Sequence, residues 1–207
     1  MAKLAVFGGT FDPIHRGHLL VAETALKQSS LDQVLWLPAY QPPHKGEPVA
    51  AFHHRMAMVR LAIADRSMFV ASDLDVEPSG VSYAARTFQR LQHYYPQVQW
   101  FWLIGNDAFQ TLPRWYLGET LAEQCTWLVV PRRLNSSSPP MTQWEQCQQV
   151  ANQLAARSIE IRWQLLDMPP VEISSSLVRQ WRREGRSIQE LVPDTIRLYI
   201  IANNLYK

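Results

Sequence analysis

A short segment near the start of the sequence gathers residue types that bind a phosphate group. Residues 8–18 (GGTFDPIHRGH) hold three of the eight glycines in the whole sequence, together with two histidines and a threonine. Glycines let the backbone approach a ligand closely, and imidazole and hydroxyl groups donate hydrogen bonds to an anion. The candidate phosphate-binding residues of this segment are Gly8, Gly9, Thr10, His15 and His18.

Other interpretations of the same segment fit less well. The spacing of His15 and His18 is half of a metal site, but no third histidine or cysteine stands nearby in the sequence. The sequence has neither the GxGxxG dinucleotide fingerprint nor the GxxxxGK[ST] phosphate loop. Isolated histidines are often only hydrogen-bonded polar groups, whereas these two flank a glycine beside a Gly-Gly turn. We therefore favour phosphate binding.

The elements that would position this segment alternate along the chain. Short apolar runs predict strands at residues 4–7, 34–37, 69–71, 97–104 and 125–130, and alternating apolar and polar residues predict a strand at 159–166. Helical spacing predicts helices at 18–27, 52–65, 82–95, 143–155, 174–184 and 193–205. Alternation from residue 4 to residue 130 is typical of a parallel α/β sheet. Ligands of such sheets lie beyond the carboxyl ends of the strands, where loops lead into helix N-termini with a partial positive charge. Residues 8–18 occupy such a place.

Composition excludes several classes of protein. The 207 residues are 47% hydrophobic and 18% charged, which is too apolar for a disordered chain. A net charge of +2 offers no general attraction to nucleic acid or membrane. No stretch approaches the length of a membrane span, and Cys125 and Cys147 form neither a disulfide framework nor a metal-binding spacing. We expect a soluble cytoplasmic protein without nucleic-acid or membrane partners; the oligomeric state is left open.

Two separated motifs resemble those of one enzyme family. Residues 8–19 (GGTFDPIHRGHL) resemble the HxGH signature of the nucleotidyltransferase superfamily, in the form carried by bacterial nicotinate-nucleotide adenylyltransferases. Residues 173–179 (ISSSLVR) are similar to the second signature, ISxTxxR. Further landmarks follow in the family's order: Pro42-Pro43-His44-Lys45, Ser82-Tyr83, Gly105-Asn106-Asp107, Trp115-Tyr116 and Arg132-Arg133. The resemblance extends from residue 4 to about residue 205.

This resemblance implies both a fold and a reaction. The expected fold is α/β, a Rossmann-like parallel sheet with helices on both faces, in one domain made of a core (1–172) and a helical C-terminal segment (173–207). The expected substrates are ATP and nicotinate mononucleotide, with Mg²⁺ bound to the ATP phosphates. The nucleophile is a phosphate oxygen that is largely ionised at pH 7, so it needs no general base. Catalysis then requires alignment of two anions and neutralisation of the leaving pyrophosphate.

The resemblance also implies a role for individual positions. The implied catalytic residues are His15, His18, Thr10 and Arg179, with His18 nearest the α-phosphate. The implied ATP-binding residues are Gly8, Gly9, Phe11, Gly105, Asp107, Ser174 and Ser176, where Asp107 accepts from ribose hydroxyls and the serines hold the β- and γ-phosphates. The implied mononucleotide-binding residues are Lys45, Ala84, Trp115 and Tyr116, where Lys45 meets the phosphate and the aromatic pair packs on the pyridine ring. The resemblance implies no metal ion held by protein side chains.

Several of these positions also have a purely structural explanation. Ser174 opens a predicted helix and is a candidate N-cap. Lys45 is a candidate surface lysine, and Trp115 a candidate core residue. The remaining arginines of residues 182–186 are expected to face solvent, whereas Arg179 stands three positions after a motif serine, on the same helical face.

One position departs from the family. After Ser82-Tyr83 the family usually carries threonine, which helps bind the nicotinate carboxylate, and this sequence has Ala84. The backbone N–H remains and the hydroxyl is lost. We expect nicotinate mononucleotide to be preferred, with a dual-specificity enzyme or one that prefers the amide as the alternative.

Functions of other classes stay open at this point. Another HxGH transferase, acting on phosphopantetheine or FMN, would keep the first motif without the Trp115-Tyr116 landmark. A nucleotide-binding regulator would keep the fold without needing His15, His18 and Arg179 together. A nucleic-acid-binding module would need a broad basic surface.

Overall fold

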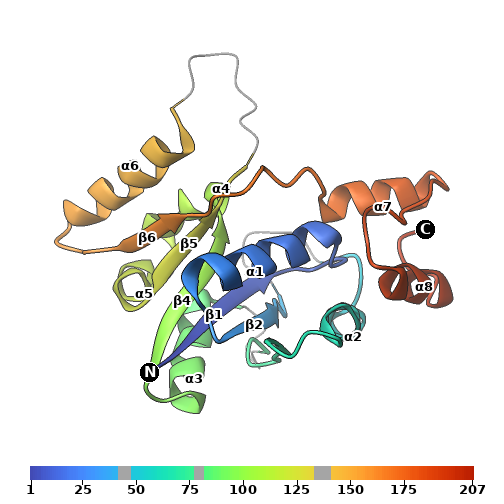
Figure 1. Cartoon of the computed structure of the whole chain (residues 1–207), viewed down its shortest axis with the longest axis horizontal. Helices are drawn as coiled ribbons and strands as arrows, with labels where there is room; N and C mark the ends of the chain where they lie inside the picture. Colours follow the sequence, from blue (N-terminus) through green and yellow to red (C-terminus); the bar gives the residue numbers. More distant parts are fainter. Residues whose placement is uncertain (42–47, 77–81, 133–140) are drawn as a thin grey trace.

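Six strands form one sheet in the order β3-β2-β1-β4-β5-β6 (Figure 1). The computed structural model describes residues 1–41, 48–76, 82–132 and 141–207. The strands are β1 (Ala2–Gly9), β2 (Gln33–Pro38), β3 (Phe69–Ala71), β4 (Val98–Gly105), β5 (Thr126–Val130) and β6 (Arg162–Leu165). All five neighbouring pairs run parallel, which confirms the predicted parallel α/β sheet.

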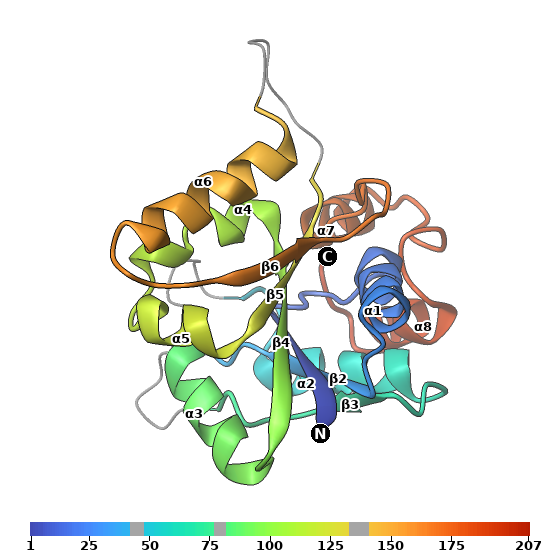
Figure 2. The ribbon, with the colours of Figure 1, turned by 60° about the vertical axis from the view of Figure 1, so that its left-hand side comes forward.

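Helices cover both faces of the sheet, as expected (Figure 2). They are α1 (Arg16–Ser29), α2 (Phe52–Ile63), α3 (Ala84–Tyr94), α4 (Asn106–Phe109), α5 (Gly118–Gln124), α6 (Gln143–Ala155), α7 (Ser175–Arg183) and α8 (Asp194–Ala202), with a 3-10 turn η1 (Leu112–Arg114). Successive side chains of a strand point to opposite faces. On β1, Ala5 and Phe7 belong to the core under α1, α2 and α8, and Leu4 and Val6 to the core under α3, α5 and α6. A strand buried on both faces reads as a continuous apolar run, which explains the sequence signal of β1.

The topology places a crevice beyond the end of β1. This strand pairs with β2 on one side and with β4 on the other, so the chain order reverses at β1. Loops that leave neighbouring strands at such a point go to opposite faces and separate, and ligands bind between them. The last helices close one side of this region, since Val178 of α7 and Ile196 of α8 share a core with α1 and α2.

The structure differs from the sequence-based elements mainly between β4 and β5. Helix α4, turn η1 and helix α5 were not among the predicted elements. Their lengths of four, three and seven residues are too short to show a helical repeat of apolar positions. In the part of the chain that the structure describes, none of the helices is long and apolar enough to cross a membrane.

Candidate active site

A cleft of about 720 Å³ opens at the carboxyl ends of β1, β4 and β5. Its walls come from the loop after β1, the start of α4 and the start of α7. The sequence-predicted residues that line it are Gly8, Gly9, Thr10, Phe11, His15, His18, Gly105, Asp107, Trp115, Ser174, Ser176 and Arg179. Most of the predicted site therefore meets at one place, although its members are up to 171 positions apart in sequence (Gly8 to Arg179).

Two predicted mononucleotide residues, Ala84 and Tyr116, are not among the described residues that line the cleft. Ala84 is the first residue of α3, and Tyr116 is 49% exposed. The Tyr116 ring packs on that of Tyr83, with ring centroids 4.8 Å apart, so these positions lie close together beyond Trp115. Lys45 falls within residues 42–47, outside the described residues.

His15 and His18 form a reciprocal cap at the start of α1. Nδ1 of His15 accepts the backbone N–H of His18 at 3.3 Å, and Nδ1 of His18 accepts the backbone N–H of His15 at 3.2 Å. The rings stack with their centroids 3.6 Å apart. Because Nδ1 is an acceptor in both rings, each neutral imidazole carries its proton on Nε2. Both histidines line the cleft.

The His15 ring is held neutral. Burial, and to a smaller extent the nearby positive charge of Arg132, lowers its pKa from 6.5 to about 3. The side chain is 4% exposed and lies at the N-terminus of α1. A neutral imidazole in this place donates a hydrogen bond to an anion without the cost of burying its own charge.

Thr10 presents a hydroxyl without a protein partner among the described residues. Its Oγ1 is buried, while its carbonyl oxygen accepts from Nη1 of Arg55 at 2.8 Å. A buried hydroxyl that lacks a hydrogen bond carries a free-energy cost. The predicted role of Thr10 as a donor to a phosphate oxygen suits this arrangement, because such a ligand would remove that cost.

The second motif lies at the start of α7, opposite the first. Ser174 is the N-cap, and its Oγ accepts the N–H of Leu177 at 3.1 Å. The structural explanation of Ser174 is therefore correct, and its hydroxyl hydrogen remains available as a donor. The start of α7 also adds unpaired backbone N–H groups to the cleft. Ser176 accepts from Nη2 of Arg179 at 3.3 Å, as the three-residue spacing predicted.

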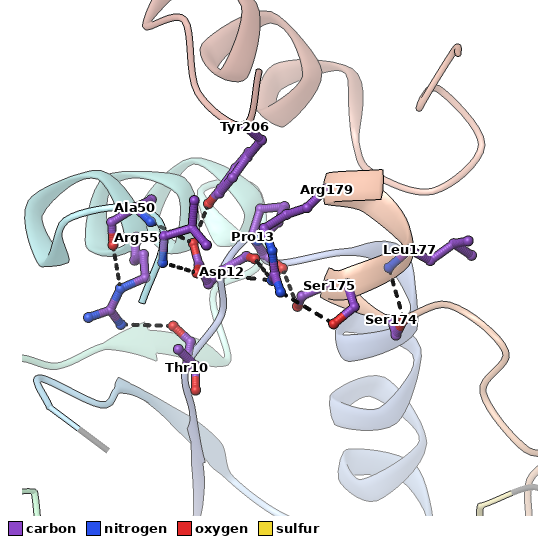
Figure 3. A network of polar contacts seen from close by, with 12 residues as sticks. Thr10, Asp12, Pro13, Ala50, Arg55, Ser174, Ser175, Leu177, Arg179 and Tyr206 are labelled. Atoms are coloured by element: carbon purple, nitrogen blue, oxygen red, sulfur yellow. Dashed lines mark hydrogen bonds and ion pairs between the residues drawn. The ribbon is translucent and has the colours of Figure 1, made fainter. Parts of the chain in front are cut away.

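Asp12 ties the first motif to other parts of the chain (Figure 3). Its carboxylate accepts from the N–H groups of Val49 (2.7 Å) and Ala50 (3.1 Å) and from the Tyr206 hydroxyl (2.6 Å). Its carbonyl oxygen accepts from Nη1 of Arg179 at 2.6 Å. Three donors therefore hold this carboxylate in place.

Arg55 supports the same loop from α2 and was not singled out from the sequence. Its guanidinium is buried and donates to the carbonyl oxygens of Ala50, Thr10, Ala39 and Tyr40. It thereby joins the ends of β1 and β2 to the start of α2. An arginine among the apolar residues of the predicted helix 52–65 was the available signal, since an arginine is almost never fully buried without partners.

Asp107 and Arg132 face each other across the ends of β4 and β5. Nε of Arg132 lies 3.6 Å from Oδ1 of Asp107, and both line the cleft. A Cβ on Gly105 would lie 2.6 Å from that same oxygen, so the glycine leaves room for the carboxylate. Arg132 appeared in the sequence only as a landmark, and the structure adds it to the wall of the site.

Trp115 serves both the core and the cleft. Its ring meets Trp127 edge-on, with centroids 6.2 Å apart, and its Nε1 donates to Oγ1 of Thr111 at 2.8 Å. The same residue lines the cleft. The core explanation of this tryptophan is therefore correct, and its packing on the pyridine ring stays a prediction.

The described residues contain no group of three or more histidine, cysteine, aspartate or glutamate side chains that could hold a metal ion. Among the described residues, two carboxylates line the cleft: Asp12, which accepts from three donors, and Asp107, which lies beside Arg132.

A parallel sheet whose first loop carries two histidines and whose last helices return a serine and an arginine to the same cleft is the architecture of a nucleotidyltransferase. In agreement, the sequence model of the cytidylyltransferase-like family matches residues 6–181. The chain is 48% identical over 206 residues to the probable nicotinate-nucleotide adenylyltransferase of Nostoc sp., covering 100% of this chain and 98% of the relative. It is 40% identical over 208 residues to that of Gloeobacter violaceus, covering 99% and 96%. The chain belongs to the nicotinate-nucleotide adenylyltransferases of the cytidylyltransferase-like family.

A solved structure agrees in fold. The chain superposes on the Plasmodium falciparum nicotinic acid mononucleotide adenylyltransferase complexed with NaAD with a TM-score of 0.76 and 20% identity, covering 100% of this chain and 98% of the other. The Rossmann-like fold and its C-terminal helices are thus shared with that protein.

Proposed function

We propose that the chain transfers the adenylyl group of ATP to the phosphate of nicotinate mononucleotide, which yields nicotinate adenine dinucleotide and pyrophosphate for NAD biosynthesis in the cytoplasm. The observation that carries this proposal is the meeting of two helix N-termini, those of α1 and α7, at one cleft lined by His15, His18 and Arg179. Helix N-termini attract anions through their free N–H groups and dipoles. Two helix N-termini at one cleft can together bind the several negatively charged groups of a triphosphate.

The reaction exchanges one bond for another at the α-phosphorus of ATP. A phosphate oxygen of the mononucleotide forms the new bond, while the bond to the oxygen that bridges the β-phosphate breaks. The electron pair of that bond leaves with pyrophosphate. No proton must be removed from the nucleophile, because a phosphate monoester is largely ionised at neutral pH.

The residues of the cleft act on the charge that develops. Nε2–H of His18 donates to the α-phosphate, and His15 and Thr10 donate to neighbouring phosphate oxygens. Ser174, Ser176 and Arg179 hold the β- and γ-phosphates, where the leaving group gains charge. Donors fixed in advance in a partly dry site stabilise that charge more than water does. The geometry that supports these roles is the stacked histidine pair and the Ser176–Arg179 contact.

The two substrates occupy different parts of the site. Gly8, Gly9 and Phe11 bring backbone against the nucleotide, and Gly105 and Asp107 receive the ribose. Trp115, which lines the cleft, is proposed to pack on the pyridine ring together with Tyr116. Ala84, at the start of α3, follows Tyr83, whose ring packs on that of Tyr116. Lys45 is proposed to meet the mononucleotide phosphate.

Mg²⁺ is proposed to arrive on the ATP phosphates. Magnesium usually keeps several waters and is held by substrate phosphates rather than by an all-protein cage. The described residues fit this mode, since they offer donors to phosphate and no cluster of free carboxylates. When bound, the ion supplies charge neutralisation to the phosphates.

The proposed function is tested by supplying different acceptor substrates together with ATP. Pyrophosphate release is measured with ATP alone, with ATP and nicotinate mononucleotide, with ATP and nicotinamide mononucleotide, and with ATP and FMN or phosphopantetheine. We expect release only with a pyridine mononucleotide, and a higher kcat/KM for the acid. Release with FMN or phosphopantetheine instead would contradict the proposed acceptor. Equal kcat/KM values for acid and amide would refute the acid preference and establish dual specificity.

A further inference from the structure

The second-to-last residue of the sequence reaches the phosphate-binding loop. The Tyr206 hydroxyl donates to Oδ1 of Asp12 at 2.6 Å, although the two residues are 194 positions apart, and both side chains are buried (Figure 3). Burial and the adjacent carboxylate raise the pKa of Tyr206, so the phenol stays protonated and remains a donor. The contact joins the end of the C-terminal segment to the centre of the first motif.

Asp12 and its neighbour Pro13 also form hydrogen bonds with other segments of the chain. One carboxylate oxygen accepts from the N–H of Val49 and the other from that of Ala50, just before α2. The carbonyl of Asp12 accepts from Arg179 of α7. The carbonyl of the next residue, Pro13, accepts from the hydroxyl of Ser175 at 2.9 Å. Both motifs are therefore held together at this point of the loop.

We propose that Tyr206 is a positioning residue for adenylyl transfer, which acts through Asp12 on the phosphate-binding loop and on Arg179. The proposal rests on the function proposed above. A carboxylate in a loop that binds a triphosphate repels the substrate unless hydrogen-bond donors compensate its charge. Two N–H groups and the phenol do so here, and the phenol is one of only two donors to Oδ1 in the described structure.

Removal of the Tyr206 hydroxyl is expected to lower the rate of the chemical step more than the stability of the fold. Without the phenol, Oδ1 keeps only the longer bond from Ala50 among these donors, at 3.1 Å. The loop between Gly9 and His15 then loses one of the contacts that hold it, and the Asp12 carbonyl that orients Arg179 shifts with it. A misplacement of about 1 Å in a catalytic group can lower a rate on the order of 100-fold.

A second tyrosine of the C-terminal segment supplies a matched control. The Tyr199 hydroxyl of α8 contacts Nδ1 of His54 of α2 at 2.9 Å. It also ties the C-terminal segment to the rest of the molecule through one phenol, but neither partner lines the cleft. A purely structural role for Tyr206 predicts equal effects of removing either hydroxyl.

The experiment compares Tyr206→Phe with Tyr199→Phe. For both variants we expect the melting temperature to fall by about 2–4 °C, the shift that loss of one hydrogen bond produces in a chain of this size. For Tyr206→Phe we expect kcat to fall about tenfold or more while the KM for each substrate changes less than threefold, since roughly 1.4 kcal/mol of lost alignment corresponds to a factor of ten. Tyr199→Phe should keep the kcat of the unaltered protein within twofold. Equal kcat values in the two variants would overturn the proposal.

A double-mutant cycle tests the route through Asp12. Asp12→Asn places an amide against two N–H donors and should lower kcat at least as much as Tyr206→Phe. If Tyr206 acts through Asp12, adding Tyr206→Phe to Asp12→Asn lowers kcat no further, whereas multiplicative losses would refute the route. Should Tyr206→Phe fail to fold, a full kcat in Asp12→Asn alone would still refute it. Absence of activity in the unaltered protein would instead contradict the proposed function.

Discussion

His15 and His18 cap each other, with the Nδ1 atom of each ring accepting the backbone N–H of the other. The same ring atoms that start helix α1 thereby fix the tautomer of both imidazoles. A serine or aspartate would cap the helix equally well. Neither would leave a ring N–H to donate to a phosphate, so the use of histidine at both positions indicates a function beyond the cap.

The substitution His18→Ala distinguishes the role of His18 in the helix cap from its proposed role as a phosphate donor. The lost cap contact should lower the free energy of unfolding by about 1 kcal/mol, which leaves the fold intact by circular dichroism. Loss of the proposed donor to the α-phosphate should lower kcat by about 100-fold or more. His93→Ala, an exposed histidine on α3, is the control and should change neither value. Full activity in His18→Ala would remove the role assigned to His18.

The buried His15 ring predicts a loss of stability in acid. Burial, with a smaller effect from Arg132, lowers its pKa to about 3 in the folded protein, against 6.5 for a free histidine. Between these values the unfolded chain binds the extra proton, so stability that is fully present above pH 6.5 is lost as the pH falls. The slope from this group is at most about 1.4 kcal/mol per pH unit.

Denaturant titrations at pH 7, 6 and 5 measure this slope. His15→Asn keeps an N-cap residue and removes the titrating ring. The stability of this variant should depend less steeply on pH than that of the unaltered protein. If both proteins lost stability at the same rate, the buried ring would not be the cause.

Ser174→Asp distinguishes a helix cap from a phosphate ligand. Aspartate caps helices as well as serine does, so the free energy of unfolding should change by less than about 0.5 kcal/mol. Its negative charge would face the β- and γ-phosphates, and the KM for ATP should rise about tenfold or more. Ser174→Ala should instead cost about 1 kcal/mol of stability. A normal KM for ATP in Ser174→Asp would reduce Ser174 to a cap.

Gly17→Ala should destabilise the protein, against the usual helix preference. Alanine in place of glycine normally favours a helix by about 1 kcal/mol. Here the new Cβ would lie 2.3 Å from Cγ1 of Val171 and 3.1 Å from Nδ1 of His15, and such overpacking costs about 1–3 kcal/mol. Adding Val171→Ala removes the obstructing methyl and should restore part of the stability. A Gly17→Ala protein more stable than the original would show that the close approach has no cost.

Ala84→Thr tests the position at which this sequence departs from its family. Restoring the hydroxyl at the start of α3 should raise the ratio of kcat/KM for nicotinate mononucleotide over the amide, by about tenfold if the hydroxyl bonds to the carboxylate. Ala84→Ser offers the hydroxyl without the extra methyl group and should act in the same direction. An unchanged ratio in both variants would place the discrimination elsewhere.

Features that depend on neighbours in sequence could be predicted. The continuous apolar runs of β1 and β4 indicated buried parallel strands, and the predicted helix 143–155 has the bounds of α6, where Thr142 and Glu145 form a capping box. The two histidines meet because they stand three positions apart at the start of one helix, a spacing that the sequence shows directly. Short elements such as α4 carry too few residues for any periodic signal.

The buried supports of the site could not be predicted in the same way. Tyr206 meets Asp12 only because α7 and α8 fold back onto the core beside α1 and α2. No local pattern marks a tyrosine that has such a partner. Arg132 resembled a family landmark, but its contact with Asp107 depends on the pairing of β4 with β5. Lys45 lies outside the described residues, so its role stays a prediction.

Arg55 holds the backbone of this site through contacts that do not depend on which side chains its partners carry. Each hydrogen bond that the described structure gives its guanidinium ends on a main-chain carbonyl oxygen, in three different segments. Carbonyl oxygens are the same whichever side chain a position carries. Substitutions at Ala39 and Tyr40 therefore leave the frame of the cleft standing. The side chains at the end of β2 can therefore be changed while the Arg55 contacts that hold the loop after β1 keep their form.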